Sequence, residues 1–130
     1  MYGTLAPKPP SASFGGRVFT TPVPFPTLAA PIGGGIYAIL VHDGMYGGPL
    51  QRLLYFGESQ SLSSRCTASH EKYQDWVRAS GGKQLFIAFH PTMGLNDQQR
   101  KDAECALINQ YRPPCNDRVD TSGMLRALSS

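Results

Sequence analysis

The chain has 130 residues, of which 41% are hydrophobic and 16% charged, with a formal net charge of +3 at pH 7. This length suits a single domain with a modest core. The small excess of Lys and Arg permits binding to a polyanion, but the chain lacks the dense basic blocks that identify nucleic-acid-binding proteins by charge alone.

The cysteines exclude a disulfide framework and a sequence-local zinc site. Cys66, Cys105 and Cys115 are odd in number and form no CxxC pair. Inert thiols in a reducing compartment are expected, with a zinc cluster that also includes His70 as the alternative. The first residues lack the pattern of a secretory signal, and prolines and glycines break the most apolar segment, 25–41. We therefore expect a cytoplasmic protein that does not enter the membrane.

Residues 1–31 are rich in Pro, Gly, Ser and Thr and have no sustained period, which predicts an extended arm instead of a helix or a central strand. Phe19, Phe25 and Leu28 could pin part of this arm to the domain. The domain itself is expected at 32–118, followed by a C-terminal tail at 119–130.

From residue 35 the pattern changes to that of a hairpin. "GIYAILV" predicts a strand at 35–41, "HDGMYGGP" a glycine-rich turn, and "LQRLLYFGE" a second strand at 50–58. The connection is longer than a tight hairpin needs, so it could itself contact a ligand.

The remaining elements are two helices and one strand. "SQSLSSRCTASHEKYQDWVRAS" has apolar residues at helical spacing and predicts one helix of about four turns, ending at Gly81-Gly82. "KQLFIAFHP" predicts a third strand at 83–91. "NDQQRKDAECALINQY" predicts a last helix, in which Asn96 and Gln99 resemble a capping box. The order β-β-α-β-α predicts a small α+β fold, with helices flanking a three-stranded, mainly antiparallel sheet.

Several polar residues stand at positions that a purely structural interpretation does not require. Glu104 lies within the apolar face of the last helix, so it must be paired, metal-bound or at the edge of a cleft; pairing with Arg100 one turn earlier is the plain alternative. Tyr37 and Tyr55 could be ordinary amphipathic strand residues. The glycines beside them, however, allow the close approach of a ligand or another backbone.

Two further residues have plain interpretations when each is taken alone. Arg65 falls in the second turn of the first predicted helix, where most arginines are solvated. Asn116 follows "RPPC", where an asparagine often caps a turn through its own side chain.

Together these residues form an ordered set that resembles the GIY-YIG nuclease family. "GIY" is retained at 35–37 and "YFG" replaces "YIG" at 55–57. Arg65, Glu104 and Asn116 follow in the family's order, so the resemblance runs from about Gly34 to Asn116.

The resemblance implies a metal-dependent endonuclease that hydrolyses phosphodiester bonds in DNA. Tyr37 and Tyr55 would be the paired active-site tyrosines, with Tyr37 positioning or deprotonating the attacking water. Arg65 would face the phosphate, and Asn116 would be a supporting polar residue. Glu104 would be the sole protein ligand of Mg²⁺ or Mn²⁺, a hard cation that also accepts water and phosphate oxygens.

The sequence departs from the family pattern at two positions. Glu58 stands where some members carry a lysine. Members often carry His or Tyr one helical turn after the arginine, where this chain has Ser69 and then His70. In a regular helix His70 would point about 140° away from Arg65, so it would join the site only through a local irregularity such as a π-bulge.

Two other functions remain open from the sequence: a non-catalytic nucleic-acid-binding or interaction module, and a nuclease toxin or effector domain. No DNA-reading motif is appended, so specificity would come from the loop at 44–52, the arm, a homodimer, or an accessory targeting or immunity protein. Candidate phosphate contacts are Lys72, Arg78, Lys83, Arg112 and Arg118.

Overall fold

The structure, a computed structural model, describes residues 12–42 and 51–116. Its two longest strands are β4 (Gly35–His42) and β5 (Gln51–Ser59), which pair antiparallel as the predicted hairpin. β6 (Leu85–Pro91) pairs antiparallel with the other side of β4. Seven of the eight residues of β4 are buried, which fits the unbroken apolar run that predicted it.

The sheet has one more strand than the sequence predicted. β3 (Val23–Pro24) pairs antiparallel with β6, so the described sheet has the order β3-β6-β4-β5, with β5 at one edge. β1 (Ser13–Phe14) and β2 (Arg17–Val18) form a separate two-stranded hairpin. Each of these strands is two residues long, too short to give a detectable period in the sequence.

The N-terminal segment is therefore packed against the domain. Phe19 and Phe25 are buried, as the sequence suggested, whereas Leu28 is fully exposed and pins nothing. Phe14 and Phe19 stack edge-on, and Phe14 also contacts Phe56 of β5. Residues 12–25 are thus extended, in short peripheral strands, and Phe19 and Phe25 attach them to the domain. Residues 1–11 lie outside the described residues.

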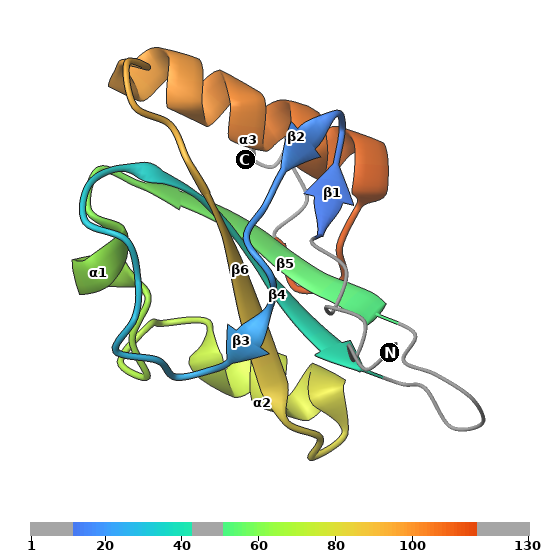
Figure 1. The fold of residues 1–130 in the computed structure, drawn as a ribbon. Coiled ribbons are helices and arrows are strands. Elements are labelled where there is room, and N and C mark those ends of the chain that lie inside the picture. Colours follow the sequence, from blue (N-terminus) through green and yellow to red (C-terminus); the bar gives the residue numbers. More distant parts are fainter. Residues whose placement is uncertain (1–11, 43–50, 117–130) are drawn as a thin grey trace, which may run out of the picture.

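Three helices flank the sheet on two sides (Figure 1). α3 (Asp97–Tyr111) lies on one side and packs Ala103 and Leu107 against the sheet. α1 (Leu62–Arg65) and α2 (Tyr73–Ser80) lie on the other side, where Trp76 is fully buried. Both halves of the predicted capping box are present at the start of α3. Within the described residues no helix is long and apolar enough to cross a membrane.

The predicted single helix over 59–80 is wrong, because it is divided into α1 and α2. The chain leaves the helical conformation at Cys66. In the connecting segment the Thr67 hydroxyl accepts a hydrogen bond from the backbone N–H of Ser69. The His70 ring accepts another from the backbone N–H of Lys72. Such local side-chain bonds to the backbone compete with helix formation.

Candidate active site

Two buried tyrosines lie on the face of the sheet that α1 and α2 cover. Tyr37 comes from β4 and Tyr55 from β5, and their ring centroids are 6.1 Å apart. Tyr37 is 1% exposed and Tyr55 is 9% exposed. Tyr55 is therefore the nearer of the two to solvent.

Gly57 makes room for the Tyr37 ring. The two residues are paired across β4 and β5, and a Cβ atom at position 57 would lie 2.2 Å from Cζ of Tyr37. Gly35 is also tightly surrounded, by the carbonyl oxygen of His90 and the side chain of Leu62. The glycines of the motif thus allow the close approach of protein groups, which is one of the two alternatives that the sequence left open.

Burial keeps both tyrosines protonated at neutral pH. The pKa of Tyr37 rises far above its ordinary value, first because of burial and then because of Tyr55. The pKa of Tyr55 rises to about 12 through burial and the charge of Glu104, while Arg65 and a hydrogen bond with Tyr37 lower it. Of the two hydroxyls, Tyr55 has the lower pKa.

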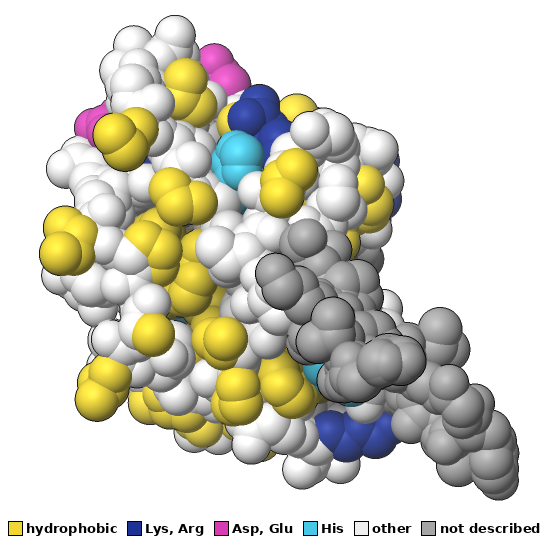
Figure 2. Space-filling model, viewed as in Figure 1, with side chains coloured by type: hydrophobic (Ala, Val, Ile, Leu, Met, Phe, Trp, Pro, Cys, Tyr) yellow, Lys and Arg dark blue, Asp and Glu magenta, His cyan; other side chains and the backbone are white. Residues whose placement is uncertain are grey.

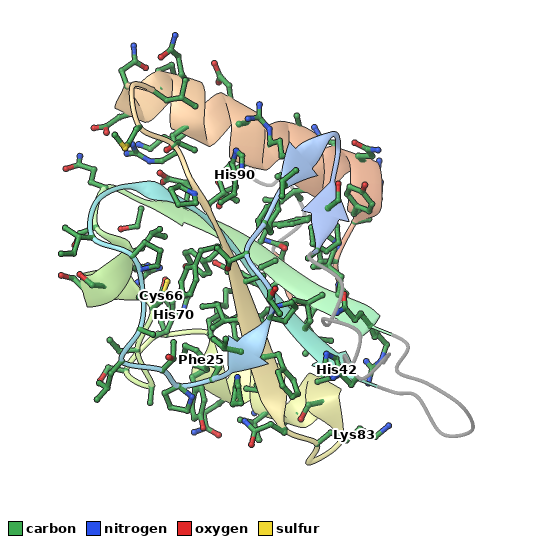
Figure 3. The ribbon with its side chains drawn as sticks, in the orientation of Figure 1. Phe25, His42, Cys66, His70, Lys83 and His90 are labelled. Carbon is green, nitrogen blue, oxygen red and sulfur yellow. The ribbon has the colours of Figure 1, made fainter. Side chains whose placement is uncertain are left out.

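His70 contacts Tyr37 directly. Its Nε2 atom lies 2.7 Å from the Tyr37 hydroxyl oxygen, and His70 is 5% exposed. The expected π-bulge is absent from the described residues; the break between α1 and α2 turns His70 inward instead. Ser69 points to the exposed side. In Figure 3 the three histidines lie apart, with His70 near α1 and α2, His42 at the end of β4, and His90 on β6 towards α3.

Arg65 is held at the surface by a bidentate ion pair. Its two terminal nitrogens donate to the two carboxylate oxygens of Glu71 at 2.6 and 2.8 Å. This hydrogen-bonded partner raises the pKa of Arg65 and lowers that of Glu71 to about 2. Because the pair is exposed, its net stabilisation is small, and a phosphate group could displace Glu71.

Glu104 is a half-buried carboxylate on α3. Among the described residues it has neither an ion pair nor a hydrogen bond. Burial, followed by the charge of Glu58, raises its pKa to about 7, against the opposing charges of Lys101 and Arg65. The alternative that Arg100 pairs with Glu104 is wrong.

Arg100 instead joins the end of β5 to the start of α3. It is 5% exposed, and it donates from Nε to Glu58 at 2.8 Å and from a terminal nitrogen to Asp97 at 2.5 Å. A buried arginine needs such partners, and it neutralises the acid that stands at position 58.

An open cavity of about 460 Å³ lies beside this ion pair. Three of its lining residues, Glu58, Lys101 and Arg65, are also the charges that act on Glu104. The complete lining is Glu58, Ser59, Gln60, Ser61, Ser64, Arg65, Asp97, Arg100 and Lys101.

Asn116 braces β5 from outside the sheet. Its side-chain oxygen accepts from the backbone N–H of Phe56 at 2.9 Å, and its side-chain nitrogen donates to the Phe56 carbonyl at 2.8 Å. The backbone N–H of Cys115 donates to the carbonyl of Leu54. The segment therefore extends the pairing at the sheet edge next to Tyr55 and Gly57, and Asn116 does not cap a turn through its side chain.

The predicted phosphate contacts that the structure describes come from α2, from the segments before and after it and from the end of α3. Lys72 and Arg78 both pair with Asp75, Lys83 is exposed after α2, and Arg112 is exposed where α3 ends. Arg118 and most of the loop at 44–52 lie outside the described residues. The face in Figure 2 carries more hydrophobic than charged side chains, unlike a phosphate-binding surface. DNA contact by these residues stays a prediction.

The zinc alternative gains no support from the described residues. In that part of the chain no three His, Cys, Asp or Glu side chains gather around a point where a metal could bind. Cys66 is buried, Cys105 is exposed and Cys115 is partly buried.

Sequence reasoning missed two partners of the site, Arg100 in its actual role and Glu71. Arg100 falls on the buried side of α3, a position where a charge signals a buried partner. Nothing in the pattern marks Glu71, because its approach to Arg65 depends on the break after α1.

Solved structures that resemble this chain come from Thermotoga maritima UvrC. The N-terminal endonuclease domain, as a tyrosine-to-phenylalanine mutant bound to its catalytic divalent cation, has 23% identity and a TM-score of 0.45. That match covers 70% of this chain and 90% of the other. The magnesium-bound domain has 22% identity and a TM-score of 0.44, covering 69% and 90%.

Both are GIY-YIG endonuclease domains. No protein-family model matches the sequence, and no curated protein matches it significantly.

The site suits a hard divalent cation. Glu104 offers carboxylate oxygens that no described protein group occupies. Mg²⁺ is commonly held by one or two carboxylates together with waters and substrate phosphate oxygens. Glu104 would be the protein ligand in such a site.

Proposed function

We propose that this chain is a GIY-YIG endonuclease that hydrolyses phosphodiester bonds in DNA with a divalent cation at Glu104. The observation that supports the proposal is the electrostatic interaction among four side chains that come from four elements. Tyr37, Tyr55, Arg65 and Glu104 act electrostatically on one another, although they come from β4, β5, α1 and α3.

Each residue has a chemical task that its surroundings support. Arg65 presents a planar fork that would exchange Glu71 for the non-bridging oxygens of the scissile phosphate. Glu104 would hold Mg²⁺ or Mn²⁺, which supplies charge stabilisation for the phosphate and the leaving oxygen. Asn116 would keep β5 in register, so that Tyr55 stays fixed beside the reacting group.

The role of contacting the attacking water falls to Tyr55 in this proposal. The sequence pattern favoured Tyr37 for this role. Tyr37, however, is the more buried tyrosine, and its hydroxyl is already hydrogen-bonded to His70. Tyr55 is closer to solvent and has the lower pKa of the pair. A general base must reach the proton of the attacking water, and its own hydroxyl must first lose its proton at moderate cost. Both conditions favour Tyr55.

One observation favours a second candidate, the non-catalytic nucleic-acid-binding module. Glu58 brings an acid to the cavity where some family members carry a lysine, and the Arg65 fork is occupied by Glu71. If these features prevented phosphate from entering, the fold would serve binding alone. A toxin or effector domain would share the chemistry of the first proposal and differ only in its biological setting.

The deciding experiment is cleavage of supercoiled plasmid by the purified chain with Mg²⁺ or Mn²⁺. We expect nicked or linear product, and we expect EDTA and Glu104→Gln each to reduce it to background. Asp102→Asn is the matched control, because it removes one negative charge from an exposed position of the same helix. Cleavage unaffected by Glu104→Gln would exclude the proposed site.

Absence of cleavage needs a second readout. Calorimetric titration with Mn²⁺ alone, on the parent and Glu104→Gln, measures cation binding without catalysis. Binding that depends on Glu104 in a chain that cuts no duplex, single-stranded or branched DNA would move the assignment to a binding module.

A further inference from the structure

His70 occupies a site whose hydrogen bonds fix its protonation state. The Nδ1 atom of the ring lies 3.0 Å from the backbone nitrogen of Lys72. A backbone N–H can only donate, so Nδ1 must carry the lone pair and no proton. In the neutral ring the proton then resides on Nε2, the atom that faces Tyr37.

The surroundings disfavour the charged ring. His70 is enclosed by aromatic rings, with centroids of Trp76, Tyr55 and Tyr37 at 4.5, 5.7 and 5.9 Å. Three charged groups act on His70. Arg65 is the last residue of α1, and Glu71 and Lys72 follow His70 in the segment before α2. Burial first, and then Arg65, lower the pKa of His70 to about 4.

The tautomer of His70 determines the direction of its hydrogen bond with Tyr37. The Nε2–H of His70 donates to the hydroxyl oxygen of Tyr37 across 2.7 Å. The Tyr37 proton therefore cannot point at His70 and must go to another acceptor. Tyr55 stands beside Tyr37, with the two ring centroids 6.1 Å apart.

We propose that His70 is a positioning residue, a permanently neutral Nε2–H donor that turns the Tyr37 hydroxyl toward Tyr55 and takes no proton during the reaction. The backbone N–H of Lys72 sets the tautomer of His70, and His70 orients the Tyr37 hydroxyl. Tyr37 would then donate to Tyr55, the more exposed of the two tyrosines. This inference rests on the proposed nuclease function for its catalytic consequence. The tautomer itself follows from the fold alone.

The first test needs no activity. Long-range proton–nitrogen NMR correlation on the ¹⁵N-labelled chain distinguishes the two neutral tautomers and the charged ring. We expect the Nε2–H tautomer for His70, unchanged from pH 5 to 8, with His42 and His90 as internal references in the same spectrum. An Nδ1–H tautomer, or titration of His70 in that range, would overturn the proposal.

The second test compares two substitutions in the cleavage assay. His70→Phe fills the volume without a donor, and we expect kcat to fall by about tenfold, the scale of one hydrogen bond, with KM little changed. His70→Gln carries an amide N–H₂ near the Nε2 position, and we expect it to recover most of that loss. Circular dichroism and thermal melting check that both variants fold.

The pH profile separates positioning from proton transfer. If His70 were a general base, His70→Gln would be as impaired as His70→Phe, and the acid limb of the parent profile would vanish in both. We expect the parent and His70→Gln to share one pH profile. A parent that cuts no DNA would refute the nuclease function, and the NMR result would then decide the tautomer independently.

Discussion

At position 57 the chain has no space for a side chain, because the Tyr37 ring lies where a Cβ atom would be. Both residues are held by the β4–β5 ladder, so neither can move aside without breaking pairing. The motif glycine therefore serves the tyrosine opposite it on the neighbouring strand.

We expect Gly57→Ala to lower the free energy of unfolding by about 1–3 kcal/mol, the usual cost of overpacking a core. Urea denaturation measures the change, with Ser63→Ala at an exposed position of α1 as the control. An unchanged midpoint would mean that the Tyr37 ring can leave its place.

The raised pKa of Glu104 predicts how the stability of the fold depends on pH. Its pKa is about 7 in the folded chain and near 4.5 in the unfolded chain. Between these values the folded state keeps a proton that the unfolded state has lost, so stability falls as pH rises from 4.5 to 7. Glu104→Gln removes this loss.

In EDTA, Glu104→Gln should therefore be more stable than the parent above pH 7, and the two should converge near pH 4. Urea midpoints across this range provide the measurement. Asp102→Asn should follow the parent, and a constant offset between the parent and Glu104→Gln would contradict the assigned burial of Glu104.

At the scale of elements, the site depends on how β5 is held at the sheet edge. Asn116 bonds to both backbone groups of Phe56, and Arg100 joins Glu58 to α3. The Asn116 contact lies within the Tyr55–Gly57 stretch, and the Arg100 contact lies directly after it. The strand that carries the motif is thus fixed by a C-terminal loop and by a helix.

Asn116→Ala removes the edge pairing of Phe56. We expect faster hydrogen exchange at the amides of β5, above all at Phe56, and a loss of about 1–3 kcal/mol in stability. Asn116→Asp can still accept from the Phe56 N–H but cannot donate, so it should recover part of the protection. Equal exchange in all three proteins would rule out the bracing role.

The main strands and α3 could be predicted because their signals are local. The apolar run of β4 ends at a glycine-rich turn, and Asn96 with Gln99 marks the start of α3. The break between α1 and α2 could not, because the residues around it keep helical spacing. His70, which lies in the break, contacts Tyr37, a residue distant in sequence that no local pattern marks.

At the scale of the whole molecule, the sheet separates two cores. Trp76 and Phe25 belong to the core under α1 and α2, and Phe19 and Leu107 to the core under α3. The N-terminal segment contributes to both. Its residues were expected to form an arm, because prolines and glycines hide the contribution of single buried aromatics.

We expect Phe19→Ala to reduce stability by about 3–5 kcal/mol, since it empties a fully buried site. Leu28→Ala, in the same segment but fully exposed, should change stability by no more than about 0.5 kcal/mol. Chemical denaturation of both variants provides the comparison. Similar, small effects would mean that the segment packs only loosely on the domain.

The ion pair between Arg65 and Glu71 has a consequence for selectivity. A lone anion such as inorganic phosphate must displace a bidentate carboxylate from the fork and gains little in exchange. A polymer that also meets a cation at Glu104 and further basic side chains gains several contacts for the same displacement. The folded chain therefore carries its own competitor for the Arg65 fork, and we expect this competition to favour a long phosphodiester strand over a small anion.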